Sequence, residues 1–492
     1  MRAYKGFEKL KDGTLMCRDM VYEPGKTYRH NGDILPCAMG FHACHELWQT
    51  WRYYPNEGET SYWEVECGGE TKESSYNDGK IVCTEITLVR EIDTNHLPVF
   101  EYVEHFGENT LICAVCDTGD EVFPVNKKIA IDKTGHPLFP ELYNTITVAL
   151  PDESLFRVKN NKLWNLVDRN GRRLLGEWQK DISLFHDGFA VITRQDDGLK
   201  NLINPEGKLL SETWFEKAYG FSEGLAFVST RETSGFINAK GDMVLETGKA
   251  LIHMSGFEEG LCLAVENGKY FFIDRKGNTH GGMTFALANT FKNGTSVVTN
   301  TEGKKNHLTR EGKLLLDEWA DNTEPFTKHG TTFARYGKTT LIINKEGKTV
   351  KNLTEDGYDE AILGEWYIIA RKGRKTDVLT PQGEKTALNG LDSVRRDSEN
   401  TLIISKQGKH NAAGHELKPL SDMWFDDISC FINGHAIVTL NKKYNYINKK
   451  GKILSDTWLK DAYPFVGDFG EAETDEGKTL VDRNGKLYQV NE

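Results

Sequence analysis

From residue 128 onward, apolar and polar positions recur along the chain in one pattern. Each copy contains two or three apolar residues, then Asp, Asn or Thr, two variable residues and Gly, as in "VDRNG" at 167–171. A degraded copy, "NAAG" at 411–414, fills the one gap in the series. The glycines lie 31 to 37 residues apart, and a nearly fixed period of this size predicts a tandem repeat architecture. The glycines of these copies are Gly135, Gly171, Gly207, Gly241, Gly277, Gly312, Gly347, Gly383, Gly414, Gly451 and Gly485.

The repeated motif has the chemistry of a hairpin turn. Asp or Asn at its first position can accept a hydrogen bond from a backbone N–H two residues later, and Gly at its fourth position tolerates a left-handed backbone. Pro205 and Pro381 occupy the second position, where the fixed φ of proline suits a type I turn. Each copy therefore predicts a β-hairpin that closes on its glycine. The motif lacks the alternating acidic ligands of a calcium loop.

A second landmark precedes a strand in many of the copies. An aromatic residue, two polar residues and Gly, as in "FSEG" at 221–224, are followed by alternating runs such as "LAFVST". Alternation of this kind predicts a strand with one buried face. Tryptophans follow the hairpins at the repeat spacing, which indicates packing between repeats rather than a ligand cage. These tryptophans are Trp178, Trp214, Trp319, Trp424 and Trp458.

These landmarks predict three short strands in each repeat of about 35 residues, with room for a fourth. The predicted fold class is therefore mainly β, with about ten tandem short-stranded antiparallel repeats over residues 128–492. Two smaller propellers, one large ring and an open β-superhelix all satisfy this pattern. We favour propeller-like closure, because a closed ring of blades removes exposed strand edges.

The repeats carry a resemblance to a known family. "FSEGLAFV" at 221–228 and "SGFINAKG" at 234–241 resemble the WG repeats that are widespread in bacterial proteins, although the Trp-Gly pair itself is eroded here. The resemblance covers roughly residues 128–492. It implies a non-enzymatic, β-rich binding or scaffolding module with no catalytic residues to transfer. We therefore expect these repeats to bind an unidentified protein partner.

The N-terminal part of the chain is organised differently. Residues 1–97 do not follow the period and predict a small α+β domain, with strands at 60–69 and 80–92. Residues 43–54 predict a helix with one apolar stripe. Residues 98–127 are expected to connect this domain to the repeats. The apolar stripe consists of Leu47, Trp51 and Tyr54.

The first 93 residues resemble a small uncharacterised domain that is common in phage and prophage proteins. The residues that carry the resemblance are "GFHAC" at 40–44, "YYP" at 53–55 and "KIVCTEITLVREI" at 80–92. The resemblance implies a phage or prophage origin and brings no established activity with it.

A second likeness of this domain, to ADP-ribosyltransferases, offers the alternative that the domain modifies a target recruited by the repeats. "YKG" at 4–6, the run at 40–54 and Glu85 or Glu91 fall in the order of that family's motifs. Lys5 stands where the family has Arg or His, no Ser-Thr-Ser motif follows, and neither glutamate belongs to a Glu-x-Glu pair. NAD is the cofactor under this hypothesis and no cofactor is expected otherwise. The candidate catalytic residues are Lys5, His42 and Glu85, and the candidate ligand-binding residues are Tyr4, Gly6 and Phe41.

Cysteine and histidine crowd together near residue 40, but their spacing argues against a metal site. Zinc sites pair their ligands at regular intervals, whereas Cys37, His42, Cys44 and His45 do not form such pairs. The "CAVC" run at 113–116 lies in another segment and lacks the βαβ context of a redox motif. We predict no metal, and His42 without a ligand would be an ordinary structural histidine.

The composition excludes some classes of partner. The formal net charge of −12 opposes general binding to nucleic acid or to an anionic membrane, because both need a basic surface. No apolar run approaches the ~18 residues of a membrane span. The nine cysteines are odd in number and unevenly spread, which favours reduced thiols in a cytoplasm, that of the host cell if the protein is phage encoded.

Overall fold

The computed structural model describes residues 1–36, 38–74, 78–115, 127–247 and 253–489. The chain divides into two compact units, Met1–Gly248 (the N-terminal unit) and Lys249–Glu492 (the C-terminal unit). The predicted fold class is confirmed, because the described residues form many small antiparallel sheets and very little helix.

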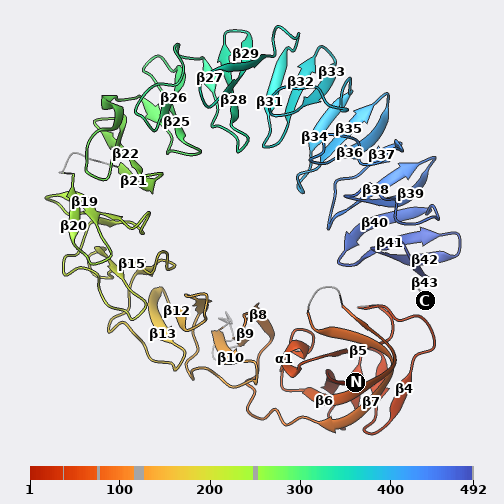
Figure 1. Ribbon diagram of the computed structural model, residues 1–492. Helices are drawn as coiled ribbons and strands as arrows, with labels where there is room; N and C mark the ends of the chain where they lie inside the picture. Colours follow the sequence, from red (N-terminus) through yellow and green to blue (C-terminus); the bar gives the residue numbers. More distant parts are fainter. Residues whose placement is uncertain (37, 75–77, 116–126, 248–252, 490–492) are drawn as a thin grey trace. The chain divides into compact units, whose positions relative to one another are not determined.

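The N-terminal unit begins with one larger sheet, drawn in red in Figure 1. Within it, β1 pairs with β5 and β6, and β7 pairs with the same two strands, so these four strands form a closed circuit. The apolar core of the domain lies inside this circuit, around Phe7, Val65 and Ile86. The strands are β1 (Arg2–Lys9), β2 (Leu15–Cys17), β3 (Met20–Tyr22), β4 (Thr27–Arg29), β5 (Phe41–Cys44), β6 (Thr60–Glu73) and β7 (Lys80–Glu91).

The helix predicted at 43–54 is shorter than expected. Helix α1 covers only Leu47–Thr50, and the residues before it form β5. The prediction was wrong here because β5 pairs residue for residue with β7, from Phe41 opposite Cys83 to Cys44 opposite Lys80. This backbone pairing is a tertiary interaction that the apolar spacing of the sequence does not reveal.

The predicted connector contains the first short sheet. Strands β8 (Tyr102–Phe106) and β9 (Thr110–Val115) pair with each other and with β10 (Lys127–Asp132). The array of short sheets therefore starts before residue 128. This sheet and the first domain share one apolar cluster. The apolar stripe around α1 belongs to the same cluster. Its members include Leu47, Trp51, Tyr54, Tyr62, Phe100, Leu111 and Ile131.

The rest of the N-terminal unit consists of three further short sheets. In each, consecutive strands pair antiparallel as a meander. The strands are β11 (Thr145–Val148), β12 (Leu155–Asn160), β13 (Leu163–Asp168), β14 (Asp181–Ile182), β15 (Ala190–Thr193), β16 (Lys200–Ile203), β17 (Lys217–Ala218), β18 (Ala226–Ser229), β19 (Ser234–Ile237) and β20 (Met243–Glu246).

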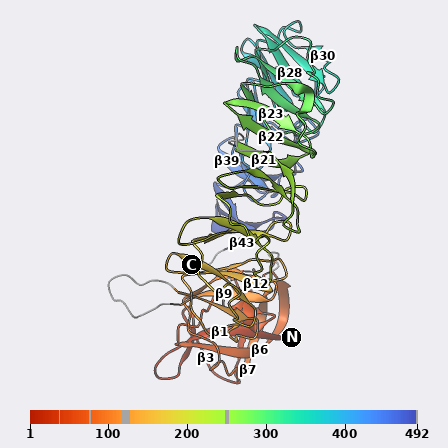
Figure 2. The same cartoon turned by 90° about the vertical axis from the view of Figure 1, so that its left-hand side faces the viewer.

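The C-terminal unit repeats the same meander. Figure 2 shows β21, β22 and β23 of its first sheet side by side. Its sheets are β21 (His253–Glu258), β22 (Leu261–Glu266) and β23 (Lys269–Ile273); β24 (Leu287–Ala288), β25 (Thr295–Thr299) and β26 (Lys305–Thr309); β27 (Asn322–Thr323), β28 (Thr331–Tyr336), β29 (Thr339–Asn344) and β30 (Thr349–Asn352); β31 (Glu360–Leu363), β32 (Ile368–Lys372) and β33 (Lys375–Leu379); β34 (Ser393–Arg396), β35 (Leu402–Lys406) and β36 (Lys409–Ala413); β37 (Asp427–Ile428), β38 (His435–Leu440) and β39 (Lys443–Asn448); and β40 (Asp461–Val466), β41 (Phe469–Thr474), β42 (Gly477–Asp482) and β43 (Leu487–Gln489). A single 3-10 turn, His280–Gly282, follows β23 in the described part of this unit.

Most repeats have only a rudimentary fourth strand. After the third strand the chain turns back and makes two isolated bridges to it, as between Val167 and Arg173 and between Trp164 and Gln179. Only β20, β30 and β43 are full fourth strands among the described residues.

Within each unit, apolar clusters join neighbouring sheets. One example combines Ile403 and Ala412 of one sheet with Val438 and Ile447 of the following sheet. Contacts between neighbours alone hold such an array together, so its stability is roughly a sum over successive interfaces. The predicted tryptophans pack at the borders of these clusters, where they are half-buried. They are Trp178, Trp214, Trp319, Trp424 and Trp458.

A buried asparagine, which the sequence analysis missed, fixes the chain after each of several hairpins. Asn445 is fully buried, and its Nδ2 donates to the carbonyls of Ser455 (2.7 Å) and Thr457 (3.4 Å). Its Oδ1 accepts from the backbone N–H groups of Tyr446 (2.8 Å) and Ser455 (3.3 Å). The signal in the sequence is an asparagine three residues before the first turn position. The equivalent residues are Asn165, Asn201, Asn306 and Asn411.

This asparagine corrects the register of the degraded copy. Because Asn411 is equivalent to Asn445, Gly414 occupies the first turn position and Leu417 the place of the glycine, three residues from where the sequence put it. The N–H of Leu417 donates to the Gly414 carbonyl (3.0 Å), and Leu417 has a left-handed φ of 53°. Leu417 lies 34 residues from both Gly383 and Gly451, so the repeat period becomes regular. Burial of its side chain offsets the cost of the left-handed backbone.

The hairpin turns have the predicted chemistry. Asp168 Oδ1 accepts from the backbone N–H groups of Asn170 and Arg172, both at 2.9 Å. Gly171 has a φ of 82° and donates to the Asp168 carbonyl (3.0 Å). The turn interpretation is therefore confirmed for this copy.

Replacing Gly451 with alanine is expected to destabilise the C-terminal unit by about 2 kcal/mol, measured by denaturant unfolding. Gly451 has a φ of 80°, and a Cβ there would lie 1.7 Å from the Leu420 carbonyl oxygen. Gly408→Ala is the matched control, since Gly408 has a φ of 75° and no atom near its Cβ position. Equal losses in the two variants would show that the close backbone contact has no cost.

Candidate functional site

A cavity of about 540 Å³ lies in the first domain, between β1, β5, the β2–β3 turn and the turns around α1. Its volume is within the range of sites for small molecules. All the candidate residues except Glu85 line it. These residues are Tyr4, Lys5 and Gly6 of β1 and Phe41 and His42 of β5.

Lys5 is a buried cation on the wall of this cavity. Its side chain is 5% exposed, and its Nζ donates one hydrogen bond, to the His42 carbonyl at 2.8 Å. The Nζ also lies 5.5 Å from the ring centre of Phe7 and 5.9 Å from that of Tyr22. Within the described part of the chain, no carboxylate forms an ion pair with Lys5. The ammonium group therefore has donor capacity left for a ligand.

His42 presents a neutral imidazole to the same cavity. Burial, with help from the charges of Lys5 and Lys80, lowers the pKa of His42 to about 4. The Nε2 atom lies 3.3 Å from the Leu35 carbonyl, which can only accept, so Nε2 carries the proton. Nδ1 is then a hydrogen-bond acceptor.

Aromatic rings that sequence reasoning did not select complete the wall. Tyr54 packs directly on β1, since a Cβ at Gly6 would lie 2.5 Å from the Tyr54 Cβ. Its hydroxyl lies 2.8 Å from Cys17 Sγ. Tyr53 donates to Asp78 (2.8 Å) and also lines the cavity. These tyrosines come from the segment predicted as a helix, so the pattern gave no sign that they face a cavity.

Glu85 lies outside the cavity lining. It pairs with Arg29 across β4 and β7, with 2.9 Å between Arg29 Nε and Glu85 Oε1. Glu91, the other glutamate considered, pairs with Lys9 (2.8 Å) and accepts from Ser61 (2.7 Å). The three candidate catalytic residues therefore do not come together in one site.

The cysteines and histidines near residues 40 and 113 were considered above as metal ligands. Among the described residues, no group of three or more His, Cys, Asp or Glu side chains is placed to hold a metal ion. Cys37 and Cys116 lie outside the described residues. Burial raises the pKa of the Cys44 and Cys113 thiols to about 12, so both are protonated at neutral pH.

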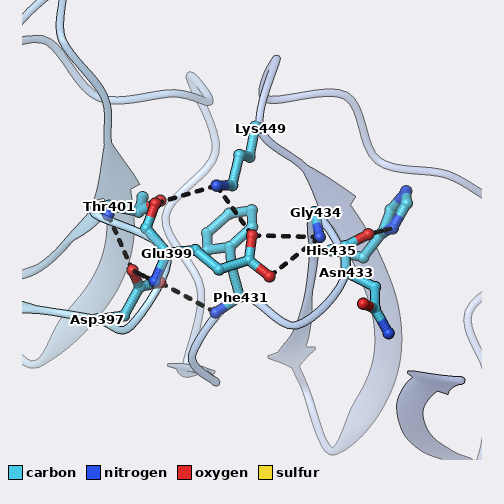
Figure 3. A network of polar contacts seen from close by, with 8 residues as sticks. All are labelled: Asp397, Glu399, Thr401, Phe431, Asn433, Gly434, His435 and Lys449. Carbon is cyan, nitrogen blue, oxygen red and sulfur yellow. Dashed lines mark hydrogen bonds and ion pairs between the residues drawn. The ribbon is translucent and has the colours of Figure 1, made fainter. Parts of the chain in front are cut away.

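In the C-terminal unit, charged residues of the hairpins link successive repeats (Figure 3). Glu399 accepts from the Gly434 N–H (3.3 Å) and pairs with Lys449 (2.9 Å). Although partial burial opposes ionisation, these contacts keep the pKa of Glu399 below its usual value. The contact recurs elsewhere in the unit, because Glu259 accepts from the Gly294 N–H (2.9 Å). These charged residues therefore have a structural role.

Comparison with known families finds an uncharacterised domain at the N-terminus and WG repeats further along, and it does not test the phage association. Residues 1–101 match the family described as a domain of unknown function (DUF7666). Residues 202–232 and 424–444 match the WG containing repeat. Comparison with curated proteins gives no match. No helix in the described ranges has the length and apolar character needed to cross a membrane.

Among solved structures, the similar chains include a eukaryotic initiation factor, with 10% identity and a TM-score of 0.32 over 65% of this chain and 97% of that one. BamB from Moraxella catarrhalis has 13% identity and a TM-score of 0.23 over 63% and 96% of the two chains. The WD40 β-propeller domain of Doa1 has 13% identity and a TM-score of 0.21 over 61% and 88%. At these TM-scores the likenesses do not bear on function.

Proposed function

We propose that the repeat array is a scaffold that binds a protein partner. The observation that carries this proposal is an exposed sheet edge that recurs along the array. In each short sheet of the described residues the first strand pairs with one other strand only, so a partner strand can be added on its outer side. Single carbonyls there accept from side chains of the preceding repeat, as Ala361 does from Arg335 (3.0 Å). In the C-terminal unit, large apolar side chains are exposed at or just after these first strands. We call them the edge residues; they are Leu287, Ile362, Ile432, Tyr463 and Val466.

Two further observations favour binding over catalysis in the array. The match to the WG containing repeat lies within it. The recurring polar residues have structural roles. The buried asparagines hold the chain after the hairpins, and residues such as Glu399 link neighbouring repeats. The edge residues, by contrast, expose large apolar side chains at equivalent places in successive repeats, and a recurrent apolar surface of this kind favours binding to a protein.

The experiment is capture of partners from host lysate on the immobilised full chain, with identification by mass spectrometry. The double variant Ile362→Asp, Tyr463→Asp is expected to lose the partner, because charges on the edge oppose burial against a protein. Val350→Asp is the matched control, since Val350 is also exposed but lies on β30, the last strand of its sheet. A partner retained equally by all three proteins, or no specific partner at all, would contradict the proposal.

The proposal extends to a phage- or prophage-encoded protein that acts in the host cytoplasm. This part rests on the resemblance of the first domain and on the uneven cysteine distribution. The genes that flank the coding sequence test it directly. The ADP-ribosyltransferase alternative is not proposed, since neither Glu85 nor Glu91 lines the cavity that contains Lys5 and His42.

A further inference from the structure

We propose that the cavity of the first domain binds a small aromatic phosphate of the mononucleotide class, with Lys5 as the buried counter-ion of the phosphate. This inference is independent of the function of the repeat array.

The first argument is the energetic position of Lys5. Burying an ammonium group without an anionic partner is costly, and proteins normally pair such a group or neutralise it. Lys5 is almost fully buried, yet it has one carbonyl acceptor and two ring faces around it and no carboxylate. An anionic ligand would supply the missing charge and the missing acceptors.

The second argument is the charge of the whole lining. Three cationic side chains, Lys5, Arg18 and Lys80, line the cavity, and one carboxylate, Asp19, opposes them. Arg18 and Asp19 lie on the exposed β2–β3 turn. The lining of this cavity is therefore net positive in a protein whose overall charge is −12, which favours an anionic ligand.

The third argument is the ring-lined wall, which favours an aromatic ligand over a bare anion. Tyr4, Tyr22, Phe41, Tyr53 and Tyr54 all contribute to it. Aromatic side chains stack on nucleobases whatever the base. The neutral imidazole of His42 adds an acceptor, through Nδ1, for an N–H or O–H of the ligand.

The test is calorimetric titration of the full chain with AMP, adenosine and inorganic phosphate. AMP is expected to bind at least tenfold more tightly than adenosine, which lacks the charge, and than phosphate, which lacks the ring. Lys5→Met is expected to weaken AMP binding at least tenfold. Lys9→Met is the matched control, because Lys9 lies on the same strand outside this cavity and is expected to leave AMP binding unchanged.

A stability measurement separates a ligand role for Lys5 from a structural one. If the Lys5 ammonium has an anionic partner only when ligand is bound, Lys5→Met removes an uncompensated buried charge from the free chain. The melting temperature of the free chain then stays equal or rises. Arg18→Ser, on an exposed turn, is the second variant should Lys5→Met fail to fold, and it is expected to weaken AMP binding as well. Failure of AMP, GMP, CMP and UMP to bind would overturn the proposal, as would AMP affinity that both variants leave unchanged.

Discussion

Replacing Asn445 with alanine is expected to lower the free energy of unfolding of the C-terminal unit by about 3 kcal/mol. The side chain makes four hydrogen bonds in a fully buried position, two as donor and two as acceptor. Alanine leaves the carbonyls of Ser455 and Thr457 and the N–H groups of Tyr446 and Ser455 without these partners. Each buried group left unpaired costs about 1–3 kcal/mol, and local relaxation recovers part of the sum.

Denaturant unfolding followed by tryptophan fluorescence measures this effect, because Trp458 lies next to the segment that Asn445 holds. Asn484→Ala is the matched control in the same unit. Asn484 is exposed, and its substitution is expected to change the stability by less than about 0.5 kcal/mol. Similar losses in the two variants would refute a special role for the buried asparagine.

Acid is expected to destabilise the C-terminal unit through His307. This histidine is fully buried, and burial lowers its pKa from 6.5 to about 4. Thr323 donates its hydroxyl to the Phe333 carbonyl (2.6 Å) and so accepts from His307 Nε2 (2.7 Å). Thr295 lies 3.4 Å from Nδ1, where its hydroxyl can donate. These partners satisfy both ring nitrogens of the neutral imidazole, and burial disfavours the charged form.

The sign of the effect follows from the two pKa values. Above pH 6.5 the ring of His307 is neutral in both states, and its contribution to stability is complete. Between pH 6.5 and about 4 the unfolded chain takes up a proton that the folded chain does not, so stability falls. Below pH 4 the loss is complete, at about 3 kcal/mol.

Urea unfolding of the wild type and of His307→Gln between pH 7 and pH 4 checks this prediction. The difference in stability between the two proteins should shrink by up to about 3 kcal/mol as the pH falls, because only the wild type carries this titrating group. The same comparison with the exposed His329→Gln should show no such trend. A pH-independent difference for His307→Gln would contradict the assignment.

Local chemistry explains why the repeats were predictable from the sequence. The Asx turn and the left-handed glycine at Gly171 depend on residues within five positions, so the motif alone determines the hairpin. Where the motif decays, the prediction fails. Residues 108–112 and 399–403 share the sequence "ENTLI", with Asn in the place of the landmark Gly, and the pattern predicts a connector where the first of these strands lies. Asn411 determines the register at Leu417 through hydrogen bonds that no turn motif contains.

The residues of the candidate site were also only partly predictable from the sequence. Tyr4, Lys5 and Gly6 share one strand, and β5 brings Phe41 and His42 to the same cavity as that strand. Strand β7 has different neighbours along its length: Cys83 pairs opposite Phe41 of β5, whereas Glu85 pairs opposite Arg29 of β4. The order of motifs along the chain contains no information about this change of neighbour.

The apolar cluster shared by the first domain and the first short sheet gives that domain a role as a terminal cap. Phe100, Leu111 and Ile131 are buried against Trp51 and Tyr62 of the domain. Repeat arrays need such caps, because an uncovered end presents an apolar face that seeks another copy. The family match ends at residue 101, yet the folding unit continues beyond it. A chain cut at that boundary would expose this apolar face, and we expect it to self-associate.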